Sequence, residues 1–169
     1  MTLFILRHGL AGEPGASRYK NDADRPLTEE GKSKMRDIAK AMEDLELEFD
    51  LIVSSPFKRA HQTAAIVAEK LDLTKKFELS ETLIPSGDTK ELIVYLNHYK
   101  PGPKSVLLVG HEPYLSGLIS LLITGERDGS VVLKKGGLAK LCLEAPLKHG
   151  RCAALKWLLT PKVMVKIGS

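Results

Sequence analysis

The sequence of 169 residues has only two cysteines, few aromatic side chains and no long hydrophobic run. No apolar stretch approaches the roughly 18 residues that a membrane-spanning helix needs, so we expect no membrane segment. Arg7 and His8 interrupt the apolar N-terminus after a few residues, so we also expect no secretory signal. The sequence therefore predicts a cytoplasmic protein.

Two cysteines are too few for a disulfide framework. Cys142 and Cys152 lie in apolar, strand-like segments, and buried reduced thiols are the state that we expect of them in a cytoplasmic protein. A disulfide across a 142–152 hairpin stays open as the alternative.

The sequence also lacks a run of charge of one sign. Its 25 Lys and Arg residues are interspersed with 21 Asp and Glu residues, and aromatic residues make up only 5%. Nucleic-acid-binding surfaces gather basic residues and often interleave them with aromatic ones, so we expect no nucleic-acid partner. The net charge of +4 is compatible with an anionic ligand.

What the sequence does contain predicts one globular domain over residues 1–169. The apolar share of 43% and the charged share of 27% are typical of a folded protein, and the length suits one domain. Strand-like runs alternate with segments whose apolar residues recur every three or four positions, as in an α/β sheet with helices on both faces. We expect strands over 2–6, 51–53, 77–80 and 105–109, and helices over 28–46, 57–71, 89–99 and 114–123.

The last third of the chain predicts antiparallel strands over 131–133, 138–143 and 153–159, with a Gly-Gly turn after the first. Lys134 and Lys135 precede that turn and are expected to protect an edge strand, a phosphate cradle being the less favoured alternative. The fold class expected is α/β: a three-layer α-β-α sandwich whose mostly parallel central sheet has an antiparallel edge.

Polar residues follow three of the predicted parallel strands at the point where each strand ends. These residues lie in segments 7–9, 54–59 and 110–113. The carboxyl ends of parallel strands meet at one edge of a sheet, where α/β proteins bind their ligands. We therefore expect four side chains to converge there: Arg7, His8, Arg59 and His111.

Two arginines and two histidines around one point suit a phosphoryl group. Each guanidinium can hold two phosphate oxygens, and its charge lowers the pKa of a neighbouring imidazole, so that the neutral ring can attack phosphorus. A second histidine, when protonated, can stabilise charge on the phosphoryl oxygens, and a phosphohistidine intermediate divides one displacement into two. Clustered guanidinium groups repel a divalent cation, so we expect no catalytic metal and no cofactor.

Arg25 and Glu112 are further candidates for substrate binding. Arg25 either adds a cation at the rim of the pocket or pairs with Asp22 or Asp24 within its loop, and both interpretations stay open. Glu112 is expected to offer its backbone N–H to phosphate at the start of the following helix. His61 is expected on a helix surface.

Taken together, these motifs resemble those of the histidine phosphatase superfamily, also called phosphoglycerate mutase-like. The matching segments are RHG at 7–9, PLT at 26–28, EG at 30–31, SSP at 54–56, RA at 59–60, QT at 62–63 and GH at 110–111. The short length, RPLT at 25–28, SPF at 55–57 and PSGD at 85–88 are most similar to the small bacterial phosphohistidine phosphatases of the SixA type. The resemblance implies that His8 is the phosphorylated nucleophile and that Arg7, Arg59 and His111 form the phosphate pocket.

The sequence departs from the wider superfamily in its general acid. Many members carry a Glu or Asp, between the second and fourth strands, that protonates an alkoxide leaving group. In residues 79–88 the only carboxylates are Glu81 and Asp88, and both are more simply interpreted as surface or helix-capping residues. An imidazole, whose conjugate acid has a pKa of about 6.5, leaves more readily than an alkoxide and needs less help from an acid.

The sequence therefore predicts a metal-independent phosphatase that acts on phosphohistidine through a covalent intermediate on His8. The expected substrate is a phosphorylated protein, such as a histidine-containing phosphotransfer domain, and the expected state is a monomer. Two alternatives stay open. One is a phosphatase for small phosphate monoesters, with Glu81 or Asp88 as an overlooked acid, and the other is a non-catalytic module that only binds phosphohistidine.

Overall fold

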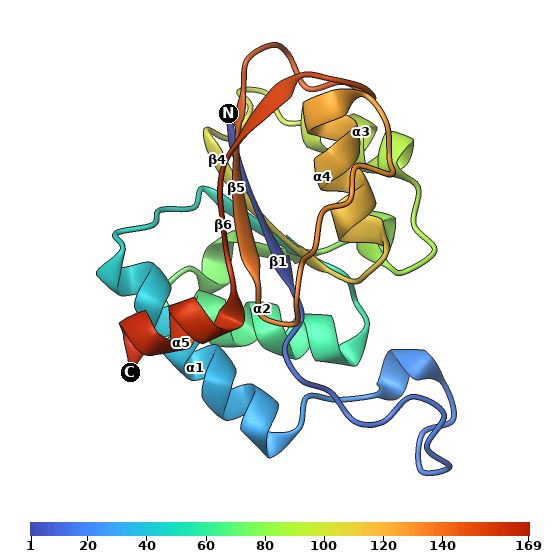
Figure 1. Cartoon of the computed structure of the whole chain (residues 1–169), viewed down its shortest axis with the longest axis vertical. Coiled ribbons are helices and arrows are strands. Elements are labelled where there is room, and N and C mark those ends of the chain that lie inside the picture. The colour runs from blue at the N-terminus through green and yellow to red at the C-terminus, as the bar shows by residue number, and fades with distance from the viewer.

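The computed structural model describes residues 1–169, which build one six-stranded sheet with helices on both faces (Figure 1). The sheet has the order β3-β2-β4-β1-β5-β6. Neighbouring strands among β1 to β4 are parallel, whereas β5 runs antiparallel to β1 and β6 antiparallel to β5. The strands are β1 (Thr2–Arg7), β2 (Leu51–Ser54), β3 (Phe77–Leu79), β4 (Ser105–Gly110), β5 (Leu138–Leu143) and β6 (Ala153–Leu159). The predicted fold class is confirmed.

The sheet divides the core into two clusters, one on each of its faces. Because successive side chains of a strand point to opposite faces, Leu3 and Ile5 of β1 join one cluster and Phe4 and Leu6 the other. Helices α3 and α4 cover the first cluster, and α1, α2 and α5 cover the second (Figure 1). Their bounds are α1 (Glu29–Asp44), α2 (Lys58–Lys70), α3 (Thr89–Asn97), α4 (Tyr114–Thr124) and α5 (Pro161–Gly168), with 3-10 helices η1 (Asp22–Asp24), η2 (Thr74–Lys76) and η3 (Glu81–Leu83).

The start of α1 anchors the long segment that returns from β1. Thr28 is the N-cap, and its hydroxyl accepts a hydrogen bond from the Gly31 backbone N–H at 2.9 Å. The Leu10 carbonyl accepts the Thr28 backbone N–H at 3.0 Å, and a Cβ at Gly31 would collide with that same carbonyl. The helix and the loop after His8 therefore touch through their backbones.

Residues 131–133 do not form the strand predicted for them. Val132 is 70% exposed, whereas Leu133 is buried, and the Leu133 carbonyl accepts a hydrogen bond from Arg7 Nη1 at 3.1 Å. The apolar, β-branched composition favours a strand, but this segment is held by a side-chain donor instead of a strand partner.

Lys134 and Lys135 do not protect an edge strand, so that prediction is also wrong. The turn they precede leads into β5, which lies inside the sheet between β1 and β6. Gly136, whose φ is 82°, donates its N–H to the backbone oxygens of Arg7 and His8 at 3.0 and 3.2 Å. The turn therefore supports the carboxyl end of β1.

Helix α5 is an element that the strand pattern of the last third does not predict. Thr160 caps it by accepting the Val163 N–H at 3.4 Å, and Pro161 occupies its first turn. Buried Met164 joins the core cluster beneath α1, and Gly168 lies against the Asp37 carbonyl. This helix completes the layer on one face of the sheet.

Both cysteines are free thiols, so the alternative of a hairpin disulfide is wrong. Cys142 of β5 lies opposite Ala154 of β6, and Cys152 comes just before β6 begins. The longest helix, α1, has 16 residues, and none of the helices is long and apolar enough to span a bilayer.

Candidate active site

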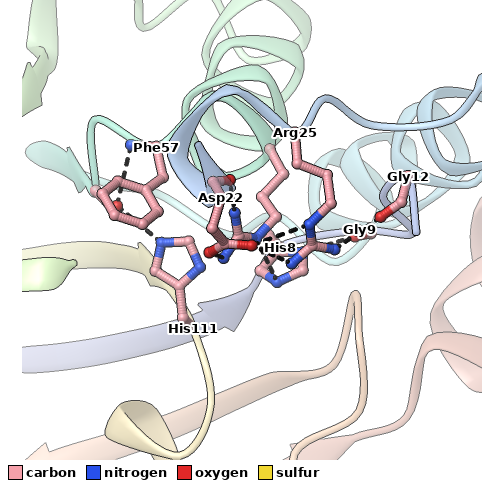
Figure 2. Close-up of polar contacts among 9 residues, drawn as sticks. His8, Gly9, Gly12, Asp22, Arg25, Phe57 and His111 are labelled. Carbon is pink, nitrogen blue, oxygen red and sulfur yellow. Dashed lines mark hydrogen bonds and ion pairs between the residues drawn. The ribbon is translucent and has the colours of Figure 1, made fainter. Parts of the chain in front are cut away.

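The carboxyl ends of the neighbouring strands β1 and β4 bring the two predicted histidines together (Figure 2), and the end of β2 beside β4 leads to the helix that carries Arg59. The His8 and His111 rings have centroids 5.2 Å apart. Arg59 reaches them from the first turn of α2, and its Nε lies 3.3 Å from His8 Nε2. Arg7 is the last residue of β1, and its charge acts on His8, Arg59 and His111. All four side chains that the sequence places at this edge are therefore found there.

Hydrogen bonding selects the tautomer of His8. Its Nδ1 lies 2.7 Å from the Gly9 carbonyl oxygen, and a carbonyl can only accept, so Nδ1 carries the proton. The lone pair of the neutral ring therefore resides on Nε2, the nitrogen that faces Arg59. The backbone is fixed as well, because His8 N–H donates to the Gly110 carbonyl at 3.0 Å.

Both histidines are held in the neutral form. Burial lowers the pKa of His8 to about 3, and the charges of Arg59 and Arg7 act in the same direction against the opposing hydrogen bond to Gly9. Burial, followed by the charge of Arg59, also lowers the pKa of His111 to about 3. His111 therefore offers an N–H to a ligand in this state, and not the full charge considered from the sequence.

His111 has one engaged nitrogen and one free nitrogen. Its Nε2 lies 2.8 Å from the Ser55 hydroxyl oxygen, which also accepts the Phe57 backbone N–H at 3.2 Å. Its Nδ1 is buried and has no partner. Figure 2 shows this nitrogen on the side of the ring that faces Asp22 and His8. A buried polar atom without a partner is costly, so Nδ1 marks a place for a ligand atom.

Arg7 provides a second unsatisfied donor. Its Nη1 donates to the Leu133 carbonyl at 3.1 Å, while its Nε is buried without a partner. Burial lowers the pKa of Arg7 and the Glu112 carboxylate raises it, and a guanidinium keeps its charge at neutral pH in either case. A cationic donor and the His111 Nδ1 are thus both open to an anion.

Asp22 connects the two remaining arginines. Arg59 donates through Nη1 to the Asp22 backbone oxygen and through Nη2 to Oδ2, both at 2.8 Å. Arg25 donates through Nε and Nη2 to Oδ1 at 3.1 and 3.0 Å, and through Nη1 to the Gly12 carbonyl at 2.9 Å. Burial alone would raise the pKa of the Asp22 carboxyl, but hydrogen bonds from Arg25 and Arg59 lower it below its ordinary value. Arg25 is therefore both the partner of Asp22 and a neighbour of the pocket.

Glu112 lies just before α4, as the predicted helix bounds place it, and the role of its backbone N–H in binding phosphate stays a prediction. The helix begins at Tyr114, and the Glu112 side chain itself accepts the Ser116 backbone N–H at 2.8 Å. Of the two acids weighed from the sequence, Asp88 caps α3 by accepting the Lys90 N–H at 2.7 Å, and Glu81 is an exposed residue at the start of η3. Both agree with the helix-capping or surface interpretation.

Comparison with known proteins agrees with this arrangement. Residues 3–84 match the family described as histidine phosphatase superfamily (branch 1). The phosphohistidine phosphatase SixA of Escherichia coli (strain K12) is 35% identical over 127 residues, which cover 75% of this chain and 76% of that protein. The chain belongs to the histidine phosphatase superfamily.

Two solved structures show how far the likeness in fold extends. The protein histidine phosphatase SixA complexed with tungstate has a TM-score of 0.82 and 30% identity, with 97% of this chain and 99% of that chain covered. The α-ribazole phosphatase from Shigella flexneri has a TM-score of 0.72 and 20% identity, with 95% and 97% covered, and shares the fold alone. The resemblance to SixA-type proteins is confirmed over nearly the whole chain.

Sequence reasoning about the superfamily motifs missed two residues of this site. Asp22 is considered there only as a loop partner of Arg25, and its spacing of three residues from Arg25 is the one available signal. Ser55 is noted only as part of a matching motif, although its hydroxyl contacts His111. Neither contact is visible without knowing how η1 lies against α2 and how β2 ends beside β4.

Proposed function

We propose that this protein is a metal-independent phosphatase that removes the phosphoryl group from phosphohistidine on a protein, through a covalent intermediate on His8. One observation supports it most. A neutral His8, with its lone pair on Nε2, has its ring centroid 5.2 Å from that of His111, whose Nδ1 is buried without a partner, and the preceding Arg7 has a buried Nε without a partner. This is the combination that an attacking nitrogen and an incoming oxyanion require.

In the first step His8 Nε2 attacks phosphorus, and the bond between phosphorus and the substrate nitrogen breaks. A substrate imidazole that is protonated on its other nitrogen takes the electron pair and leaves as a neutral base. The phosphorylated His8 ring becomes a cation, and the Gly9 carbonyl, which accepts the Nδ1–H at 2.7 Å, stabilises it. Arg7, Arg59 and His111 hold the phosphoryl oxygens, and Arg25 supports them from the rim.

In the second step water attacks the same phosphorus, and the bond to Nε2 breaks. The water oxygen stays on phosphorus, its two protons remain on the phosphate product or pass to solvent, and His8 regains its lone pair. No carboxylic acid is needed, because neither leaving group is an alkoxide. This fits a site in which the carboxyl bonded to Arg25 and Arg59, that of Asp22, is kept ionised and is therefore a poor proton donor.

The relatives support the same substrate class. The 35% identical protein is a phosphohistidine phosphatase, and the structure with a TM-score of 0.82 holds tungstate, a tetrahedral oxyanion of the same shape as phosphate. We infer a phosphorylated protein as the partner, of the histidine-containing phosphotransfer type, and a monomeric enzyme without a metal, a cofactor or a nucleic acid.

The test is the release of phosphate from a phosphohistidine peptide and from common sugar phosphates. The wild type should prefer the peptide, and His8→Ala should slow release by about a thousandfold or more. His61→Ala is the matched control, because His61 is an exposed histidine on α2. The His8 variant should also fail to form the acid-labile phosphoenzyme.

Three outcomes would contradict this proposal. Turnover that survives in His8→Ala would remove His8 from the nucleophile role. A preference for sugar phosphates would favour the monoesterase alternative and return attention to Glu81 and Asp88. Phosphate-competable binding of the peptide without release would make the chain a binding module.

A further inference from the structure

The donors of Arg59 that face the pocket are already occupied in this structure. Its Nε points at His8 Nε2, and its Nη1 and Nη2 donate to the backbone oxygen and the carboxylate of Asp22. The Arg59 side chain is only 4% exposed. A phosphoryl group at His8 would need these same N–H groups, so it meets a carboxylate that holds them first.

Asp22 is more accessible than the arginines it binds. Its side chain is 51% exposed, against 9% for Arg25, and it lies on the three-residue helix η1 in the loop between β1 and α1. Its two carboxylate oxygens divide between Arg25 and Arg59. Figure 2 shows this carboxylate between the His111 ring and the Arg25 side chain. An anion therefore stands at the mouth of the pocket with the cations behind it.

We propose that Asp22 is a resident anion which the phosphoryl group of a substrate displaces from Arg59 and Arg25, so that this residue sets how tightly the site holds phosphate. The inference rests on the proposed function only in placing the phosphoryl group beside His8. A carboxylate and a phosphate oxygen cannot both accept the same N–H, so binding is an exchange of one anion for another.

The exchange has a consequence for which ligands are retained. Free phosphate gains the arginines only by giving up the Asp22 contacts, so its net affinity is low and Asp22 can return when the product leaves. A phosphoryl group carried on a protein also gains the contacts of its carrier protein, and these offset the loss of the Asp22 hydrogen bonds. Asp22 thereby favours a macromolecular substrate over its own small product.

The experiment measures the affinity of inorganic phosphate and of tungstate by calorimetry, in the wild type and in Asp22→Asn. We expect about tenfold tighter binding in the variant, because the competing charge is gone while the amide keeps the shape. Asp24→Asn is the matched control. Asp24 lies in the same 3-10 helix, and its Oδ2 approaches the Asn21 amide nitrogen at 3.5 Å rather than an arginine.

A merely structural role for Asp22 predicts a different result. Its removal leaves two buried guanidinium groups without their shared anion, so the melting temperature of the ligand-free variant should fall in either case. A structural role gives no reason for phosphate to bind tighter, whereas displacement does, and the tungstate structure described below separates displacement from a simple loss of repulsion. Unchanged affinity in Asp22→Asn, or weaker affinity, would overturn the inference.

A crystal structure of the wild type with tungstate tests the same point without a variant. We expect tungstate oxygens at Arg59 Nη1 and Nη2 and the Asp22 carboxylate beyond hydrogen-bond distance. Tungstate bound while both contacts to Asp22 persist would contradict displacement. These results are independent of the turnover test. Anion exchange at Asp22 can occur in a protein that fails to hydrolyse phosphohistidine, and a protein that does hydrolyse it can bind tungstate without displacing Asp22.

Discussion

A single serine hydroxyl decides how His111 presents its proton. Ser55 Oγ accepts the Phe57 backbone N–H, which leaves its own proton available for His111 Nε2 at 2.8 Å. When that proton is donated, the imidazole proton belongs on Nδ1, the nitrogen without a partner. Ser55 is therefore a positioning residue that acts through His111.

Ser55→Ala is expected to lower kcat by about tenfold with a small change in KM, because the substrate still meets both arginines while His111 loses its fixed tautomer. Steady-state kinetics on a phosphohistidine peptide measure the effect. Ser54→Ala is the matched control, since Ser54 is equally buried but donates to the Ser55 carbonyl. Equal kcat values in the two variants would contradict this role.

The site residues that the sequence could place are those at or next to the end of a strand. Arg7 ends β1, and His8 and His111 directly follow β1 and β4, so the parallel pairing of these two strands is enough to bring them together. Asp22 is not next to a strand end, and its position depends on how a loop folds onto α2. The contacts between that loop and α2 involve side chains of the helix, and a strand pattern does not encode them.

At the scale of elements, the contact between α1 and the preceding loop joins the helix layer to the site. Gly31 brings the first turn of α1 against the Leu10 carbonyl, which is already bonded to the Thr28 N–H. The same loop continues to η1, which carries Asp22, and to Arg25. The position of α1 thus helps to set where these two side chains lie.

Gly31→Ala should lower the free energy of unfolding by about 1–3 kcal/mol, because the new methyl group collides with a fixed carbonyl. Helix propensity alone predicts the opposite, a gain of about 1 kcal/mol. Urea denaturation distinguishes the two. Ser33→Ala, at an exposed position of the same helix, should change the free energy by less than about 0.5 kcal/mol. A stabilised Gly31→Ala protein would show that the loop yields easily.

The elements that sequence predicted well are those with both an apolar period and a cap. Thr28 and Asp88 cap α1 and α3 as expected of their residue types. The failures have a common cause in tertiary contacts. Segment 131–133 has the composition of a strand, but the carbonyl of Leu133 accepts a hydrogen bond from Arg7. Helix α5 is short and forms where Met164 can pack beneath α1.

At the scale of the whole molecule, the two neutral histidines make the folded state less stable in acid. The fold holds His8 and His111 neutral with pKa values of about 3, through burial and through the charges of Arg7 and Arg59, whereas a histidine in the unfolded chain has a pKa of about 6.5. Between these values the unfolded chain binds more protons. Stability is therefore fully present above pH 6.5 and is lost as pH falls toward 3.

We expect the free energy of unfolding to fall by about 1.4 kcal/mol per pH unit for each of the two histidines within this window. Urea denaturation at several pH values from 7 to 4 measures the slope. In His111→Asn the slope should be about half that of the wild type, because one of the two protons is no longer taken up. Stability that stays flat from pH 7 to 5 would contradict the neutral assignment of both rings.

The central place of β1 in the sheet has a further consequence for which parts of the molecule open locally. The backbone N–H groups of Arg7 and His8 donate to the carbonyls of Gly137 and Gly110 where β1 ends between its two neighbouring strands, whereas the loop that carries Asp22 is held by an isolated bridge between Ala11 and Leu27 and by side chains. Amide hydrogens beside the nucleophile should exchange only when the whole fold opens, and those of η1 by local opening. The two sides of one pocket would then belong to different cooperative units, so the entrance can rearrange around an incoming phosphoprotein while the attacking nitrogen stays in place.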